Sequence, residues 1–98
     1  MAETRSAQIA PHLYCGPVVA AANIQIATAT PNFLILESIG QFDGPYTSMV
    51  DIDWQWENGY VIPPTVPGIG VTLKDEVISA LPYTGSELHL DMVTEPVG

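Results

Sequence analysis

The stretch IAPHLYCGPVVAAANIQIATATPNFLILE, residues 9–37, decides the fold predicted for this chain. Residues 6–11 are predicted to form a short buried strand, which a Cys-Gly-Pro turn follows. Proline is favoured in the first turn of a helix, because the N–H that it lacks would be unpaired there anyway. A helix is therefore predicted over residues 18–29, directly after Pro17, and Pro31 ends it.

The apolar residues of the predicted helix and of the segment after it indicate that both are packed against other parts of the protein. An apolar stripe with helical spacing is predicted to be the buried side of the helix: Val19, Ala22, Ile26 and Ala29. The segment NFLILE, residues 32–37, has four consecutive apolar residues before Glu37. This pattern is typical of a strand that is buried on both faces of a parallel sheet. Residues 6–37 are thus predicted to form a strand–helix–strand unit with a right-handed crossover.

The remainder of the chain differs in composition, since it has many glycines and prolines and no long periodic run of apolar residues. Residues 38–72 are predicted to be loop with one small hairpin, in which Asn58-Gly59 is the turn between DIDWQW and YVIPP. Three prolines exclude a central strand after that hairpin: Pro63, Pro64 and Pro67.

A short helix is predicted from Thr72 to Leu81, where Thr72 and Asp75 resemble a capping box. Its predicted apolar face consists of Val77, Ile78 and Leu81. No regular element is predicted for residues 83–98, and the chain has no internal repeats.

Composition limits the classes of protein to which this chain can belong. Its 98 residues suffice for one domain, and a hydrophobic share of 47% argues against intrinsic disorder. Only 13% of the residues are charged, about half the usual share. We therefore expect that further protein surrounds this chain, since so few charges cover little surface.

The charge balance disfavours polyanionic partners. The net charge is −9, and Arg5 and Lys74 are the two basic residues. Binding to nucleic acid or to an anionic membrane relies on clustered lysine and arginine, so neither is expected as a partner. A single cysteine, the lack of a signal-peptide pattern and the lack of an apolar run of about 20 residues predict a cytoplasmic chain.

Two ionisable side chains follow the two predicted strands. His12 and Glu37 would both lie at the carboxyl ends of adjacent parallel strands, about 4.8 Å apart, where α/β proteins place their chemistry. A histidine there can exchange a proton with substrate, and a glutamate can orient it or, if held protonated, donate to an oxyanion. The spacing is equally compatible with a hydrogen-bonded strand-end histidine and a simple loop carboxylate.

Other conspicuous residues receive structural interpretations. Cys15 could be a nucleophile near a helix N-terminus, but a small apolar filler is favoured. The glycines of GIG, residues 68–70, follow a proline loop and do not form a dinucleotide fingerprint. Trp54 and Trp56 are predicted to pack on one face of the hairpin, as core or interface. A solvated face is predicted for Asp51, Asp53 and Glu57.

At this point the motifs resemble a known family. APHLYCGPVVAAANIQIATATPNFLILE, residues 10–37, is similar to the end of the barrel domain in the enolase superfamily, of the mandelate racemase/muconate lactonizing enzyme type. WENGYVIPPTVPGIGVTLKDE, residues 56–76, resembles the closing segment of that family. The resemblance covers about residues 6–80 and is greatest to acid-sugar dehydratases of the galactonate type.

The resemblance implies an α/β fold, the C-terminal piece of a (β/α)7β barrel. Residues 1–37 would contain strand 7, helix 7 and strand 8, and residues 38–98 would be a closing segment that packs on the capping domain of a longer parent. His12 matches the general acid/base of the family at the end of the seventh strand. Glu37 matches the glutamate after the eighth strand, which hydrogen-bonds the substrate as an electrophile.

The same resemblance implies a reaction and its cofactor. Family enzymes hold Mg²⁺ through three acidic residues on the third to fifth strands, abstract the proton α to a carboxylate and, in the dehydratases, eliminate water. The metal ligands and the aspartate that orients the histidine would lie outside this chain, so the chain alone is expected to be inactive and to bind no Mg²⁺ tightly. Expected partners are an acid sugar, the missing strands, the capping domain and further copies in a homo-oligomer. A racemase or epimerase, or a non-catalytic chain that acts by association, are the alternatives.

Overall fold

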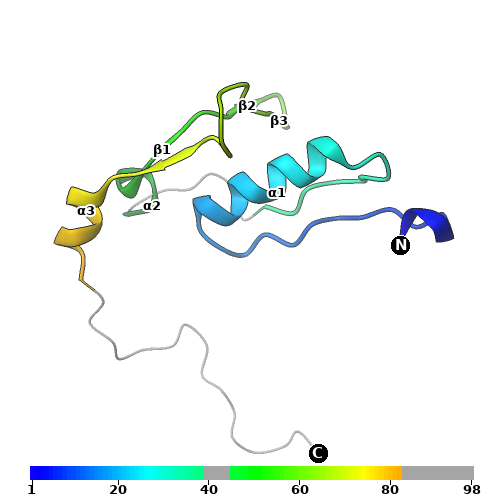
Figure 1. The fold of residues 1–98 in the computed structure, drawn as a ribbon, viewed down its shortest axis with the longest axis horizontal. Helices are drawn as coiled ribbons and strands as arrows, with labels where there is room; N and C mark the ends of the chain where they lie inside the picture. Colours follow the sequence, from blue (N-terminus) through cyan, green and yellow to red (C-terminus); the bar gives the residue numbers. More distant parts are fainter. Residues whose placement is uncertain (39–44, 83–98) are drawn as a thin grey trace, which may run out of the picture.

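The computed structural model describes residues 1–38 and 45–82. A short 3-10 turn, η1 (Glu3–Arg5), begins the chain, and an extended segment leads from it to helix α1 (Pro17–Ala29). A second extended segment, residues 32–37, then runs back along the helix, so that α1 lies over both segments in Figure 1. Residues 83–98, for which the sequence predicts no regular element, lie outside the described residues.

Helix α1 begins one residue before the predicted start and ends at the predicted residue, but it buries a different face. Pro17 occupies its first turn, and Thr30 has an extended backbone, which ends the helix before Pro31. The stripe predicted to be buried is wrong, because Val19 and Ile26 are 41% and 51% exposed. The buried side lies opposite and has the same helical spacing: Pro17, Ala20, Ala21 and Ile24. Apolar residues surround this helix on all sides, so contacts with its neighbours, rather than periodicity, determine which side is buried.

The two extended segments run parallel, but regular strands do not form over residues 6–11 and 32–37. One parallel bridge joins Ile9 to Phe33, and the N–H of Leu34 donates to the Ile9 carbonyl at 2.9 Å. The prediction that NFLILE is buried on both faces is also wrong, since Leu34 and Ile35 are 59% and 61% exposed. Within residues 1–38 and 45–82 this pair of segments forms no wider sheet that would cover these side chains.

The segment after Glu37 contains more structure than the single predicted hairpin. Helix α2 (Pro45–Met49) leads into strand β1 (Val50–Ile52), which pairs antiparallel with β4 (Val71–Leu73). The predicted hairpin is present between β2 (Gln55–Glu57) and β3 (Tyr60–Ile62). Its turn residues Asn58 and Gly59 have φ of 49° and 81°, as a two-residue type I′ turn requires.

Helix α3 (Asp75–Ala80) begins later than the sequence predicts. Thr72 pairs with Asp51 in the β1–β4 ladder, so it is unavailable as a helix cap. Lys74 is the N-cap residue and makes no side-chain capping hydrogen bond, so the predicted capping box is wrong. The extended conformation of β4 therefore determines where α3 begins.

In the described part of the chain, one core cluster connects residues 1–38 with residues 45–82. Five buried side chains form it, and the partly buried Leu36, Val61 and Val71 pack against it. Those five are Leu13, Ala20, Ala21, Ile24 and Trp54. Of the two tryptophans predicted as core or interface, Trp54 is a core residue at 3% exposed, whereas Trp56 on β2 is 37% exposed.

Candidate functional site

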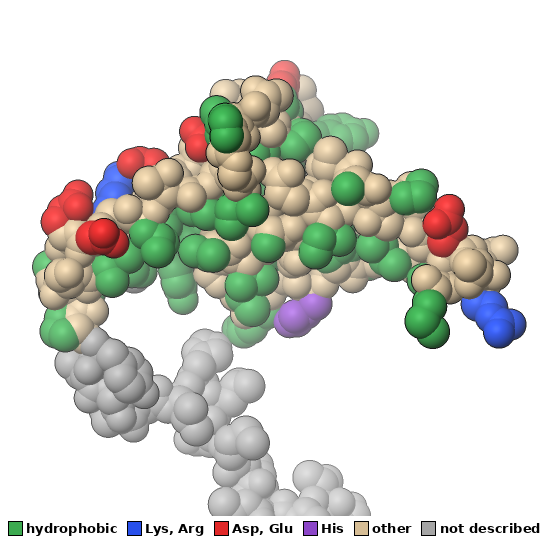
Figure 2. Space-filling model, in the orientation of Figure 1, with side chains coloured by type: hydrophobic (Ala, Val, Ile, Leu, Met, Phe, Trp, Pro, Cys, Tyr) green, Lys and Arg blue, Asp and Glu red, His purple; other side chains and the backbone are tan. Residues whose placement is uncertain are grey.

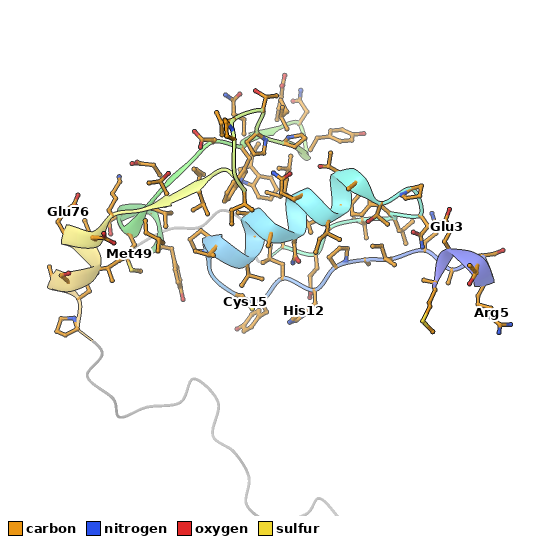
Figure 3. The ribbon with its side chains drawn as sticks, viewed as in Figure 1. Glu3, Arg5, His12, Cys15, Met49 and Glu76 are labelled. Carbon is orange, nitrogen blue, oxygen red and sulfur yellow. The ribbon has the colours of Figure 1, made fainter. Side chains whose placement is uncertain are left out.

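The structure brings the two candidate side chains of the sequence analysis together. His12 and Glu37 follow the two parallel segments, and the Nδ1 atom of His12 lies 2.6 Å from Oε2 of Glu37. This separation is within hydrogen-bonding distance. Figure 3 shows the His12 side chain projecting from its segment on the side away from α1. A sequence separation that predicts a shared sheet edge thus becomes a direct contact between the two side chains.

The backbone around His12 is held by two further contacts. The N–H of Leu13 donates to the same Oε2 atom of Glu37 at 2.9 Å. On the opposite side, the Asn23 side chain of α1 donates from Nδ2 to the His12 carbonyl at 2.7 Å. Because Leu13 is itself 1% exposed in the core, the segment that carries His12 is anchored to the helix and to the second strand segment.

These contacts determine the charge of Glu37. The hydrogen bond from the Leu13 N–H has the largest effect and lowers the pKa of the Glu37 carboxyl from its ordinary value of 4.5. Desolvation opposes it, and the neighbouring His12 lowers the pKa further. A lowered pKa keeps the carboxylate ionised at neutral pH, where it accepts hydrogen bonds. Of the two roles that sequence reasoning left open for Glu37, this electrostatic environment favours orienting His12 over donating a proton.

The pair is accessible to small molecules. The side chains of His12 and Glu37 are 73% and 51% exposed, respectively. Both Glu37 contacts use Oε2, so within the described part of the chain Oε1 has no protein partner. The arrangement therefore offers one imidazole for proton exchange and one carboxylate oxygen for a hydrogen-bond donor on a ligand.

The other conspicuous residues contribute no further group to this site. Cys15 is exposed, so its interpretation as an apolar filler is wrong. The predicted solvated face is exposed, and its Asp51 pairs with Lys74 at 2.7 Å. Across residues 1–38 and 45–82, no group of three His, Cys, Asp or Glu residues is placed to hold a metal ion.

Sequence reasoning missed two groups that hold the site, the Leu13 amide and the Asn23 side chain. A backbone N–H leaves no signal in the residue type, so the first could not be found. Asn23, however, is one of three polar residues in a mostly apolar helix, beside Gln25 and Thr28. A polar side chain that is partly buried often has a specific hydrogen-bond partner.

Comparison with known proteins defines the class. The model of the enolase C-terminal domain-like family matches residues 1–77, so the chain belongs to that family. Within the enolase superfamily it is of the mandelate racemase/muconate lactonizing enzyme type and similar to acid-sugar dehydratases. None of the helices in the described ranges is both long enough and apolar enough to cross a membrane.

Individual relatives support this placement. The chain is 32% identical over 80 residues to the D-xylonate dehydratase of Haloferax volcanii, covering 82% of this chain and 19% of that protein. It is 31% identical over 84 residues to the D-galactonate dehydratase of Ralstonia nicotianae, covering 80% of this chain and 22% of that protein. The chain thus spans about a fifth of the length of these curated relatives.

Solved structures agree in fold. A protein from Labrenzia alexandrii assigned to the mandelate racemase/muconate lactonizing enzyme group is 60% identical with a TM-score of 0.82, covering 93% of this chain and 24% of that one. The mandelate racemase/muconate lactonizing enzyme from Jannaschia is 42% identical with a TM-score of 0.79, covering 92% and 23%. An enolase C-terminal domain-like α/β fold is therefore established for this segment.

Proposed function

We propose that this chain forms the C-terminal part of a Mg²⁺-dependent acid-sugar dehydratase. Residues 1–37 would supply strand 7, helix 7 and strand 8 of its (β/α)7β barrel, and residues 38–98 its closing segment against the capping domain. The observation that carries the proposal is the 2.6 Å contact between His12 and Glu37 at the ends of two parallel segments. Similarity to D-xylonate and D-galactonate dehydratases supports the choice of reaction.

In the proposed reaction His12 is the catalytic residue that moves the proton. Its imidazole takes the proton from the carbon α to the substrate carboxylate, and the C–H electron pair forms a C=C bond. The resulting imidazolium returns that proton to the β-hydroxyl, which leaves as water. The resulting enol becomes a 2-keto-3-deoxy acid. Glu37 would accept a hydrogen bond from a substrate hydroxyl through Oε1 and so orient the substrate near His12.

The proposed function includes Mg²⁺, but we do not place its ligands among the described residues. A bound divalent cation stabilises the charge that develops when a proton is removed next to a carboxylate. Mg²⁺ prefers an octahedron of oxygen ligands. His12 and Glu37 do not form such a set, and the described ranges contain no group of three candidate ligands. We therefore assign the metal ligands to acidic residues on the third to fifth strands of the complete barrel.

Racemisation or epimerisation is the alternative within the same superfamily. There the proton removed by one group would be returned to the same carbon, and no water would leave. This alternative is supported by the similarity to solved structures assigned to the mandelate racemase/muconate lactonizing enzyme group. The products distinguish the two reactions, since only dehydration yields a 2-keto-3-deoxy acid.

A chimera tests the proposed function. The Labrenzia alexandrii protein, 60% identical over the shared region, would serve as the host whose matching segment is replaced by this chain. A folded chimera should convert at least one acid sugar to a 2-keto-3-deoxy acid in the presence of Mg²⁺, and His12→Asn should abolish the conversion. His89→Asn is the matched control, since it removes the other histidine of the chain. Turnover that survives His12→Asn would refute the assignment of His12.

A non-catalytic role by association is the second candidate, and exposed apolar side chains favour it. On α1, Val18, Val19 and Ile26 are 43%, 41% and 51% exposed. Figure 2 shows hydrophobic side chains spread over the visible face with few charged side chains between them. Sedimentation of the isolated chain tests this candidate. A monomer with a cooperative thermal transition would contradict it, because such a chain would have a self-sufficient core.

A further inference from the structure

The pairing of the two parallel segments begins with a side chain in place of a backbone donor. Ile9 donates to the Asn32 carbonyl and accepts from the Leu34 N–H, both at 2.9 Å, which is the pattern of one regular parallel bridge. If this ladder continued toward the N-terminus, the backbone N–H of Asn32 would donate to the Ala7 carbonyl. The Ala7 carbonyl accepts instead from Nδ2 of the Asn32 side chain, at 2.7 Å. Asn32 therefore binds the first segment twice, through its carbonyl and through its side chain.

The side-chain contact is specific to one alignment of the two segments. Backbone groups do not distinguish one register from the next, since every residue except proline carries the same N–H and C=O. Burial of one face usually specifies register, but the consecutive Leu34 and Ile35 are 59% and 61% exposed. Leu36 packs against the core, and Asn32 is the residue of NFLILE whose side chain carries N–H groups. Its bond to Ala7, together with the packing of Leu36, therefore selects the observed register.

The register decides whether Glu37 reaches His12. Its Oε2 atom lies 2.6 Å from Nδ1 of His12 and accepts from the Leu13 N–H at 2.9 Å. Neighbouring residues of an extended chain are about 3.3 Å apart and point to opposite faces. A shift of one residue would therefore move the Glu37 side chain by about 3.3 Å and reverse its face. A displacement of that size takes both pairs of atoms beyond hydrogen-bonding distance.

We propose that Asn32 is a positioning residue, which fixes the register of the two parallel segments and thereby holds Glu37 at His12. It precedes Glu37 by five positions, which is about 16 Å of extended chain, so it acts on the site through the backbone. The loss of one hydrogen bond of this kind changes an equilibrium constant by about three- to tenfold. The consequence for catalysis rests on the proposed function, but the register does not.

Amide hydrogen exchange in the complete chain, followed by nuclear magnetic resonance, tests this inference. Exchange measures how often a hydrogen bond opens, so it detects loss of register even where the opened state is rare. The amides of Ile9, Leu34 and Leu13 report on the pairing and on the site. The Ile24 amide, inside α1, reports on general loss of structure. In Asn32→Leu, which keeps a branched side chain without an N–H, the three reporter amides should exchange about three- to tenfold faster, with Ile24 unchanged.

Two further variants make the result specific. Asn32→Gln keeps the amide on a longer side chain, so its exchange rates should lie between those of wild type and Asn32→Leu. Gln8→Leu makes the same type of replacement at an exposed position next to Ala7 and should leave all four rates unchanged. If Asn32→Leu does not fold, Asn32→Gln and Gln8→Leu are compared directly, and Asn32→Gln should then show the faster exchange at the three reporter amides.

The inference is overturned if a folded Asn32→Leu variant leaves the Leu13 rate unchanged, because the bond to Ala7 would then not control the site. Equal acceleration of all four amides would also overturn it, since that result reflects general destabilisation. The outcome is separable from that of the proposed function. A chimera without turnover beside the expected exchange pattern would refute the dehydratase proposal alone. An active chimera beside unchanged exchange in Asn32→Leu would refute the positioning role of Asn32 alone.

Discussion

Replacing Gly70 with alanine should destabilise the chain more than the same change at either of two other glycines. Gly59, Gly68 and Gly70 all have positive φ, at 81°, 90° and 81°. An alanine forced into such a backbone costs about 1–3 kcal/mol at each position. Only at Gly70 would the new methyl group also meet another residue, Pro64, whose Cβ lies 2.9 Å away and whose Cγ is closer still.

The clash adds a cost that the other two variants lack. Overpacking a tight site typically costs about 1–3 kcal/mol, because atoms must leave their preferred positions. The free energy of unfolding of Gly70→Ala should therefore fall by that amount beyond the fall in Gly59→Ala and Gly68→Ala. At both control positions no atom of residues 1–38 or 45–82 lies within 4 Å of the new methyl group. Since the Gly70 carbonyl accepts from the Asp53 N–H at 3.0 Å, the strain would also reach the segment that carries Trp54.

Urea unfolding of the three variants, followed by far-ultraviolet circular dichroism and by tryptophan fluorescence, measures these differences. The double variant Pro64→Ala/Gly70→Ala removes the nearest proline atom and should recover part of the loss, which a double-mutant cycle detects. If the loss in Gly70→Ala is within about 0.5 kcal/mol of that in Gly68→Ala, Pro64 moves aside freely and the reasoning is wrong.

Three further outcomes are expected. Leu13→Ala should lower the free energy of unfolding by about 2–5 kcal/mol, since it removes a core side chain that is 1% exposed and leaves the amide that binds Glu37. Val18→Ala on the exposed side of α1 is the control, and equal losses would contradict the assigned core. The pKa of Glu37 is lower in the folded chain than its ordinary value of 4.5, so its stabilising contribution is present above pH 4.5 and is lost as the pH falls through the lowered value. Glu37→Gln should therefore weaken the loss of stability in acid, and an unchanged acid-unfolding curve would count against this. Isothermal titration of the chain with MgCl₂ should reveal no micromolar site, because His12 and Glu37 do not offer the oxygen ligands that Mg²⁺ prefers; a micromolar site would mean that the chain itself holds the metal.

The sequence was sufficient to predict those structural features that are determined by residues close to one another in the chain. Pro17 and Pro31 bracket α1 because proline is compatible with a first turn and incompatible with a continued helix. The Asn58-Gly59 turn specifies the β2–β3 hairpin because both residues tolerate a positive φ. The same holds for the approximate position of the site, since His12 and Glu37 end two apolar segments that flank one helix.

The buried side of α1 was predicted wrongly for a physical reason. A helix with apolar residues on all sides has no periodic minimum in hydrophobicity, so only its neighbours select Ala20, Ala21 and Ile24 for burial. The β1–β4 pair was missed because Val50 pairs with Leu73, and no local pattern specifies a partner so distant in sequence. That pairing in turn moved the start of α3 past Thr72.

The sequence by itself determined the order of two parallel extended segments around one helix, the hairpin and the two side chains of the candidate site. Only the tertiary structure decided that the carboxylate of Glu37 contacts both the Leu13 amide and His12. The contact forms beside Pro11, which has no N–H to donate and whose carbonyl accepts from the N–H of Glu37 at 3.3 Å. Residue types state which groups can ionise, whereas register and backbone geometry decide which hydrogen bonds those groups form.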